Sequence, residues 1–476
     1  MMHGNLIGGN WQETAQGFDN INPSDTRDII GRYAASSPAD AQAALAAARA
    51  AQKQWAASTP QMRFDILDRA AEEILARKAE LGDLLAREEG KTLPEAIGEA
   101  TRAGMIFKFF AGEALRPGGE MLPSVRANVS VEISREPVGV VAAITPWNFP
   151  LAIPAWKVAP ALAYGNCVIL KPAEIAPGCA WALADILHRA GLPAGVFNLL
   201  LGQGAILGPI LAQQSDAISF TGSTGVGRDV CQTAAAAGTR VQLEMGGKNP
   251  LIVLDDADLD TAVECAVQGA FYSTGQRCTA SSRLIVTPGI ADRFAEALAK
   301  ATRALRVGDA RHPDTQIGPL ASEAQMDKVR SYIEGAAAEE AELIAGKEPL
   351  HPDQPGHYLR PHLFDHCTAE MAICREEIFG PVASIERVAD YEAAIEAANA
   401  TSFGLASGIC TTSLKYAADF KRRAEAGMTM VNLPTAGVDY HVPFGGRKAS
   451  SYGPREQGSY AREFFTTVKT SYQFAG

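Results

Sequence analysis

One cysteine stands in a setting that suits nucleophilic chemistry. Cys278 follows Gln276 and Arg277 in the run TGQRCTA. The thiolate is the reactive form of cysteine, and a neighbouring cation favours it. Cys278 is therefore a candidate nucleophile. The alternative is a small buried apolar residue, which is the usual state of a free cysteine and our interpretation of the remaining cysteines.

Two other side chains could serve a reaction at a thiol. Glu244 begins the run EMGG after a predicted strand over 240–243, and a carboxylate there could act as a general base. Asn148, in WNFP, follows a predicted strand over 138–145 and could donate its amide to an oxyanion. The plainer interpretations are a solvated loop acid for Glu244 and a turn cap for Asn148.

Two segments indicate a nucleotide. Lys171 and Glu174, in KPAE after a predicted strand over 167–171, could hold the hydroxyls of a ribose. Glu174 would repel a 2′-phosphate and so favours NAD over NADP, unless both residues are only surface charges. Gly222 and Ser223 lie in FTGSTGVG, where a helix N-terminus could bind phosphate. The spacing differs from GxGxxG, so this run alone is a weak signal.

Apolar runs that alternate with helical segments must position these residues. The middle of the chain has β-rich runs over 138–145, 167–171, 196–200 and 217–220, with helical segments over 177–190 and 225–237. This alternation predicts a parallel, doubly wound α/β sheet, which binds ligands at the carboxyl ends of its strands.

The flanking regions extend this pattern. The first hundred residues read as helices, over 38–57, 62–78 and 94–115. A second α/β cycle starts at Pro250, with predicted strands over 251–254 and 284–287 and predicted helices over 258–271 and 290–305. We therefore place a boundary near Gly246 and Gly247.

Two segments alternate with the period of two that half-exposed antiparallel strands show. They are Val129-Val131-Ile133 and the tail over 464–472. A tail that must cover one face often does so against another subunit, and an ordinary edge hairpin is the alternative.

Composition narrows the class of protein. The 476 residues carry a net charge of −11, with a pI near 5.4, which argues against nucleic acid or an anionic membrane as the main partner. We expect no signal peptide, no membrane span and no metal site. The eight scattered cysteines indicate reduced thiols, and so a cytoplasmic enzyme.

Taken together and in order, these runs are much more specific than each alone. WNFP, KPAE, FTGSTGVG, EMGGKNP, GQRCTA, EEIFGP and PFGGRKAS resemble the NAD(P)-dependent aldehyde dehydrogenase superfamily. The resemblance implies a Rossmann-like NAD-binding domain (1–120 and 138–246) and an α/β catalytic domain (247–447). It also implies a small antiparallel β oligomerisation arm with the C-terminal tail (121–137 and 448–476), in a homodimer or homotetramer.

The resemblance also assigns roles residue by residue. Cys278 would be the nucleophile, Glu244 the general base, and Asn148 with the backbone N–H of Cys278 the oxyanion hole. The cofactor would contact Pro146, Trp147, Lys171, Glu174, Gly204, Gly222, Ser223, Glu377 and Phe379. The implied reaction oxidises an aldehyde to its acid through a cysteine thiohemiacetal and a thioester.

Arg277 bears on the substrate. A guanidinium beside the thiol could pair with a carboxylate at the far end of an aldehyde, or it could serve only the scaffold. The run over 432–458, with Ser451 where most of the superfamily has glycine, resembles the α-ketoglutaric semialdehyde (2,5-dioxovalerate) dehydrogenase branch. Succinate semialdehyde, glutaraldehyde or a broad range of aldehydes are alternatives, and a non-catalytic relative is the alternative from another class.

Overall fold

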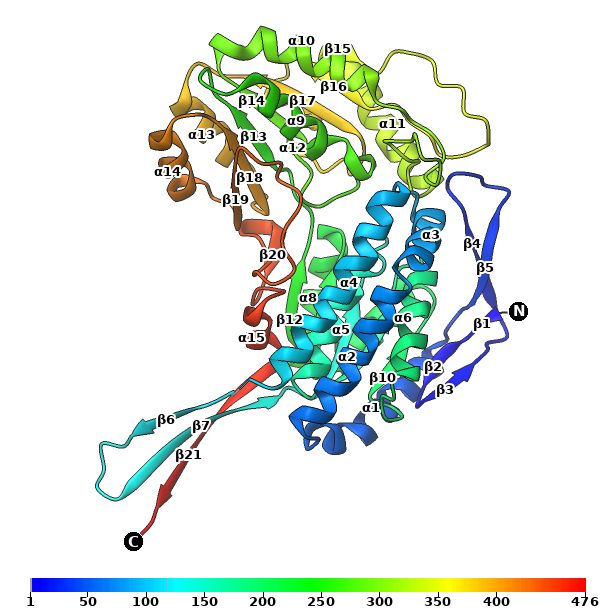
Figure 1. Cartoon of the computed structure of the whole chain (residues 1–476), viewed down its shortest axis with the longest axis vertical. Coiled ribbons are helices and arrows are strands. Elements are labelled where there is room, and N and C mark those ends of the chain that lie inside the picture. Colours follow the sequence, from blue (N-terminus) through cyan, green and yellow to red (C-terminus); the bar gives the residue numbers. More distant parts are fainter. Residues whose placement is uncertain (1, 117) are drawn as a thin grey trace.

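The computed structural model describes residues 2–116 and 118–476, and it is built around two large sheets (Figure 1). An eight-stranded sheet has the order β20-β12-β11-β8-β9-β10-β2-β3, and a seven-stranded sheet has the order β15-β16-β17-β14-β13-β18-β19. Two three-stranded sheets complete the fold, with the orders β1-β5-β4 and β21-β7-β6. The expected α/β class with two large units is confirmed.

The centre of the first sheet is parallel. Its five parallel strands are β8 (Val140–Ile144), β9 (Cys167–Lys171), β10 (Phe197–Leu199), β11 (Ala217–Thr221) and β12 (Arg240–Glu244). Every residue of β8 and β9 is buried, as expected for strands that are covered on both faces. The antiparallel strands are β2 (Asn5–Ile7), β3 (Asn10–Gln12) and β20 (Ser451–Tyr452), of which β3 and β20 form the two edges.

Helices cover both faces of this sheet. They are α1 (Pro38–Ala56), α2 (Pro60–Ala76), α3 (Lys78–Glu89), α4 (Leu93–Ala114), α5 (Ala152–Ala163), α6 (Gly178–Arg189), α7 (Gly204–Gln214) and α8 (Thr224–Ala237). Helix α1 corresponds to the predicted helix over 38–57, and Ser37 and Asp40 form a capping box around Pro38 at its start. The predicted helices over 62–78 and 94–115 correspond to α2 and α4.

The prediction that the first hundred residues are helical is wrong for the N-terminus. Five short strands precede α1, namely β1 (Met2–His3), β2, β3, β4 (Gly17–Ile21) and β5 (Ile29–Ala34). Each has only two to six residues, which leaves too little periodicity for a strand to be recognised.

The second sheet repeats the parallel arrangement. Its strands are β13 (Pro250–Val253), β14 (Arg283–Val286), β15 (Glu342–Ala345), β16 (His362–Asp365), β17 (Val382–Arg387), β18 (Ala406–Cys410) and β19 (Met428–Val431), of which only β15 is antiparallel. Its helices are α9 (Leu259–Ala270), α10 (Pro288–Ala304), α11 (Glu323–Ala338), α12 (Ala372–Arg375), α13 (Tyr391–Asn399) and α14 (Leu414–Arg423). The short turns η1 (Tyr272–Gly275) and η2 (Lys448–Ser450) flank this unit's contacts with the first sheet.

The third part is a long antiparallel arm (Figure 1). It consists of β6 (Glu120–Pro123), β7 (Val129–Pro137) and β21 (Thr466–Phe474), and β21 pairs with β7 along nine residues. Short elements η3 (Ser459–Ala461) and α15 (Arg462–Phe465) precede β21, so the predicted tail strand starts at Thr466 and not at 464. Ser451–Tyr452, expected in the arm and tail, lies instead at the edge of the first sheet.

Candidate active site

Cys278 follows a turn of unusual backbone conformation. Three residues of η1, Ser273, Thr274 and Gly275, have left-handed φ values of 51°, 56° and 66°. A Cβ at Gly275 would lie 2.2 Å from the carbonyl oxygen of Gly380, so only glycine fits there. The turn therefore forces a sharp change of direction immediately before the thiol.

Groups from both large units hold this turn. The carboxylate of Glu95, on α4, accepts hydrogen bonds from the backbone N–H and the hydroxyl of Ser273, at 2.8 and 2.9 Å. The hydroxyl of Thr274 donates to the carbonyl of Gly318 at 3.1 Å, and the amide of Asn249 donates to the carbonyl of Cys278 at 2.7 Å. The position of Cys278 is fixed by these contacts.

The thiol lies where two cavities meet. The first, which we name the strand-end cavity, has a volume of about 150 Å³ and is lined by Pro146, Trp147, Asn148, Ile153, Thr221, Gly222, Ser223, Met245, Gly246, Cys278, Gln325, Lys328, Glu377 and Phe379. The second, which we name the helix-lined cavity, has a volume of about 420 Å³ and is lined by Glu95, Gly98, Glu99, Arg102, Phe149, Ile153, Trp156, Ser273, Arg277, Cys278, Thr279, Gly437, Val438, Asp439, Tyr440 and Phe444. Only Ile153 and Cys278 line both.

The surroundings of Cys278 disfavour its ionised form. Burial raises the pKa of the thiol to about 12, and the carboxylates of Glu377 and Glu244 act in the same direction. Arg277 and Cys278 attract each other electrostatically, but burial has the larger effect on the pKa of the thiol. The Arg277 guanidinium donates to the carbonyl of Gln268, and it does not offset the burial of the sulfur.

Asn148 is buried beside the turn that carries Cys278. Its amide donates to the carbonyl of Gln276 at 2.9 Å, which leaves one of its two N–H groups for another acceptor. Behind it, the ammonium of Lys91 donates to the carbonyl of Asn148 at 2.7 Å and to Glu99 at 2.6 Å. Asn148 is therefore an anchored amide that lines the same cavity as the thiol, and its side chain bonds to the Cys278 segment and not within its own turn.

Glu244 ends β12 and is only 2% exposed. Its carboxylate accepts a hydrogen bond from the hydroxyl of Ser451 at 2.6 Å. Burial raises the pKa of Glu244 well above its usual value, and the nearby carboxylate of Glu456 acts the same way. The interpretation of Glu244 as a solvated loop acid is therefore wrong.

The strand-end cavity gathers the residues expected to bind a dinucleotide. Gly222 and Ser223 lie between β11 and α8, and no side chain caps the free N–H groups at the start of α8. The rings of Trp147 and Phe379 meet edge to face at 5.4 Å. The carboxylate of Glu377 accepts the backbone N–H of Gly247 at 2.9 Å. Strand ends, a free helix N-terminus and carboxylates are thus brought together around one cleft.

Three further predicted residues form a group at the end of β9. The ammonium of Lys171, 3% exposed, lies 3.3 Å from the carboxylate of Glu174, and the backbone N–H of Gly204 donates to that carboxylate at 2.5 Å. Gly204 is the first residue of α7, so the Glu174 carboxylate closes a helix N-terminus. The pair is an ordered carboxylate and ammonium, and not a set of unattached surface charges.

The helix-lined cavity contains two guanidinium groups, of Arg277 and Arg102. Arg102 donates to the carbonyl of Val438 and to the amide oxygen of Gln457, and its guanidinium lies 5.8 Å from the Trp156 ring centroid. Both arginines have a buried Nε–H without a partner, and in the described part of the chain neither forms an ion pair with a carboxylate. Burial lowers the pKa of both groups, which is the cost of holding unpaired cations there.

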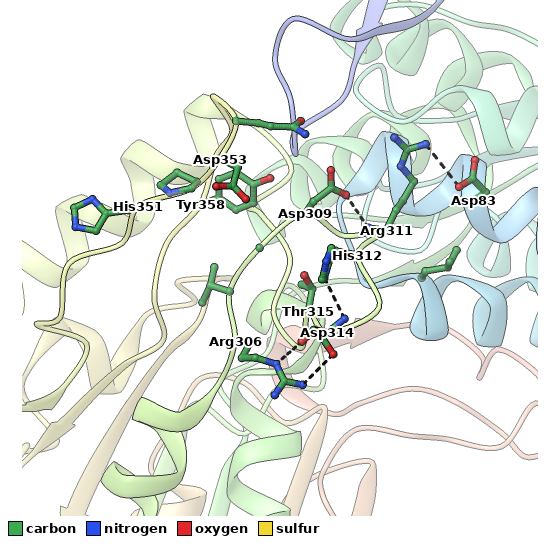
Figure 2. A pocket seen from close by; sticks show the side chains of 15 residues that line it. Asp83, Arg306, Asp309, Arg311, His312, Asp314, Thr315, His351, Asp353 and Tyr358 are labelled. Carbon is green, nitrogen blue, oxygen red and sulfur yellow. Dashed lines mark hydrogen bonds and ion pairs between the residues drawn. The ribbon is translucent and has the colours of Figure 1, made fainter.

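A further cavity, of about 580 Å³, contains none of the predicted site residues (Figure 2). Its arginines already have partners within the cavity. Arg311 pairs with Asp83 at 3.8 Å, and Arg306 donates to the backbone carbonyl of Asp314 at 2.7 Å. A search of residues 2–116 and 118–476 finds no group of three or more side chains suited to a metal ion, and no helix long and apolar enough to cross a membrane.

Sequence reasoning missed two important residues of the site, Arg102 and Lys91. Arg102 lies within the predicted helix over 94–115, where an arginine has no distinguishing signal. Lys91 lies in the EEGKT run before α4. The two glutamates that precede it form a cluster of charges that could have drawn attention to it. Neither residue neighbours the recognised runs, so only the folded chain brings them to Cys278.

Comparison with known proteins agrees with this geometry. The aldehyde dehydrogenase family matches residues 11–471. Alpha-ketoglutaric semialdehyde dehydrogenase of Bacillus subtilis is 44% identical over 98% of this chain and 97% of its own length. Betaine aldehyde dehydrogenase of Rhizobium etli is 41% identical over 98% and 96%, respectively. A crystal structure of betaine aldehyde dehydrogenase from Staphylococcus aureus in complex with NAD+ superposes with a TM-score of 0.97, at 34% identity, covering 100% of this chain and 95% of that one.

The chain belongs to the aldehyde dehydrogenase family, and it is an oxidoreductase that acts on aldehydes. The family expected from the recognised runs is thus confirmed, together with its full-length α/β fold.

Proposed function

We propose that this protein oxidises an aldehyde that carries a distal carboxylate, most specifically α-ketoglutaric semialdehyde to 2-oxoglutarate, with NAD as the cofactor. The observation that carries this proposal is the pair of buried guanidiniums without carboxylate partners in the cavity that holds the thiol. A substrate carboxylate would supply the missing partner, and Arg binds carboxylates through paired hydrogen bonds. The name of the Bacillus subtilis relative supports the same substrate.

The strand-end cavity, together with the group of Lys171, Glu174 and Gly204 outside it, offers side chains and backbone N–H groups suited to a dinucleotide. The N–H groups of α8 at Gly222 and Ser223 would take its phosphates, Lys171 and Glu174 would hold the adenosine ribose, and Glu377 would hold the nicotinamide ribose. Pro146, Trp147, Gly204 and Phe379 would line the groove. The NAD+ in the Staphylococcus aureus structure supports this assignment. When bound, the cofactor supplies the hydride acceptor.

The chain's own residues account for the remaining chemistry. The thiolate of Cys278 attacks the aldehyde carbon, and the oxyanion of the thiohemiacetal accepts hydrogen bonds from the Asn148 amide and the Cys278 N–H. Oxidation converts this adduct to a thioester. Glu244 then removes a proton from the water that attacks the thioester, and the carboxylic acid leaves. The burial of Glu244 at the end of β12 and its electrostatic effect on the Cys278 thiol support this role.

Betaine aldehyde is the second candidate, because aromatic residues line the same cavity and two of the relatives bear that name. Aromatic rings can bind a quaternary ammonium. The guanidinium of Arg102 lies over the face of Trp156, however, and it would repel a second cation there. The arrangement therefore favours the anionic substrate.

The test compares kcat/KM for α-ketoglutaric semialdehyde, an uncharged aldehyde of equal length and betaine aldehyde. We expect the wild type to prefer the acid semialdehyde, and Arg277→Ala and Arg102→Gln each to lose about ten- to hundredfold on it, the range for one hydrogen bond to a charged group. The control is Arg311→Ala, in the cavity of Figure 2, which should leave the preference intact. Equal rates on all three substrates in every protein would contradict the proposal.

The arm suggests a homodimer or homotetramer. Its sheet exposes Met121 (81%), Val125 (104%), Tyr472 (62%) and Phe474 (67%). An exposed strand edge with apolar side chains needs a covering surface, and we propose that a second copy of this chain provides it. All eight cysteines are free, which is consistent with the reducing cytoplasm that we propose as its location.

A further inference from the structure

One hydroxyl contacts the base of the proposed reaction directly. Ser451 and Glu244 are cross-strand neighbours, because β20 pairs antiparallel with β12 at this position. The Ser451 Oγ donates to Glu244 Oε2 at 2.6 Å, and it accepts the backbone N–H of Gly446 at 2.6 Å. We propose that Ser451 is a positioning residue that holds Glu244 in place and in its ionised form for hydrolysis of the thioester, an inference that rests on the base role proposed above.

The direction of the hydrogen bonds supports this role. A serine hydroxyl has one hydrogen to donate. Because the Gly446 N–H already donates to the oxygen, the hydrogen of Ser451 is directed to Glu244. An ionised carboxylate only accepts hydrogen bonds, so the contact stabilises the charged form of Glu244 relative to the neutral one.

Several groups around Glu244 influence its pKa, and Ser451 is one of the few that lower it. Burial and the carboxylate of Glu456 raise the pKa of Glu244, whereas Ser451, Lys157 and Arg455 lower it. Lys157, on α5, donates to Glu456 and to Ser219, and Arg455 donates to the carbonyl of Gly446.

The Glu244 carboxylate also acts electrostatically on the thiol of Cys278, whose pKa it raises. Across residues 2–116 and 118–476, Ser451 is the one side chain that donates a hydrogen bond to the Glu244 carboxylate. Loss of this hydroxyl should therefore affect the base more than loss of either cation would.

A purely structural role is the alternative. Ser451 also joins the segment around Gly446 to the first sheet, and its loss could simply loosen the site. The two roles differ in what they slow. Loss of a positioning group should slow thioester hydrolysis and move its pH dependence, whereas loosening should slow thioester formation equally.

The experiment uses Ser451→Ala and Ser451→Thr, with Ser450→Ala as the matched control. Ser450 is the adjacent buried serine, whose hydroxyl accepts the backbone N–H of Gly404 and does not contact Glu244. An uncharged aldehyde and NAD+ are mixed with each protein between pH 6 and pH 9. The NADH formed in the first turnover, the steady-state rate, and the thioester on Cys278 by intact mass are followed together.

We expect Ser451→Ala to form NADH in the first turnover at the wild-type rate and to accumulate the thioester. Its steady-state rate at pH 7 should fall about ten- to hundredfold, as for one lost hydrogen bond to a charged group, and its acid limb should move to higher pH. Ser451→Thr, which keeps the hydroxyl, should restore both. Ser450→Ala should leave the position of the acid limb unchanged.

The proposal is overturned if Ser451→Ala retains the wild-type pH profile, or if it slows the first turnover and the steady state equally. It is also overturned if Ser450→Ala shifts the acid limb as far as Ser451→Ala does. Because the aldehyde is uncharged, these outcomes do not depend on the substrate specificity. Failure of the base role itself would be recognised separately, since Glu244→Gln would then turn over normally.

Discussion

The strand-end cavity and the helix-lined cavity share Cys278, but the chain builds them in different ways. The strand-end cavity is formed largely by loops that follow β8, β11 and β12 in the parallel sheet. The helix-lined cavity combines two helices, α4 and α5, with the loop over 437–444, which lies more than three hundred residues after α4 in the chain: Arg102 and Val438, which are hydrogen-bonded, are 336 residues apart. Sheet topology thus specifies one cavity, and long-range packing specifies the other.

The two cavities also differ in whether the fold class predicts them. Any doubly wound sheet offers ligands the carboxyl ends of its strands, so a cofactor site there follows from the fold. The helix-lined cavity has no such rule, and its two arginines give it a specific electrostatic character. Cofactor binding and substrate choice should therefore respond to different substitutions.

The largest expected effect comes from the residue that the two cavities share. Cys278→Ala should lower aldehyde oxidation by about 10⁴-fold or more, because it removes the nucleophile, while NAD+ binding to the strand-end cavity persists. NADH formation and NAD+ titration by calorimetry measure the two properties. The control Cys231→Ala changes a half-buried thiol on α8 and should retain activity. Oxidation by Cys278→Ala at the wild-type rate would exclude Cys278 as the nucleophile.

The pH dependence of the first-turnover rate tests Cys278, the thiol that lines both cavities. Burial raises the pKa of Cys278 to about 12, so the ionised fraction of the thiol increases with pH throughout the range from 6 to 9. The first-turnover rate of NADH formation should accordingly rise by about tenfold per pH unit there, because only the thiolate attacks. Stopped-flow measurement across this range provides the test. A rate that is constant from pH 6 to 9 would mean that the thiol is already ionised, contrary to the burial seen here.

The smallest effect is expected at Glu174, which lies outside the strand-end cavity, beside Lys171 and the start of α7. Glu174→Ala should increase the ratio of NADP to NAD use by about fivefold, because it removes a unit charge whose repulsion of a 2′-phosphate is worth roughly 1 kcal/mol in solvent. Its selectivity for the aldehyde should not change. Steady-state kinetics with both cofactors, and Glu296→Ala on the outer face of α10 as the control, provide the measurement. An unchanged cofactor ratio would remove Glu174 from the ribose site.

The same contrast explains what the sequence could predict. Lys171 and Gly222 were found because each follows a continuous buried strand, whose apolar run is easy to recognise. Glu244 was placed correctly at a strand end, but its burial was not foreseen, because β20 covers it only after the chain has returned from the second sheet.

Arg102 could not be predicted. Its helix was recognised, but nothing in a helical pattern shows which distant loop an arginine will face. The ionisation state of Cys278 could not be predicted either. The Arg277 guanidinium is adjacent to Cys278 in sequence, yet it donates to the carbonyl of Gln268. The sequence shows which charged residues lie near one another along the chain, whereas packing determines which groups their side chains bind.

Because of the left-handed turn before Cys278, the position of this cysteine depends on the completion of folding. Left-handed backbone costs a residue other than glycine about 1–2 kcal/mol, so Ser273 and Thr274 hold this shape only with outside support. That support comes from Glu95 on α4, which packs on the first sheet, and from Gly318, which precedes α11 in the second unit. Until these two regions have docked, the turn lacks both contacts, so the placement of Cys278 between the two cavities depends on completed folding.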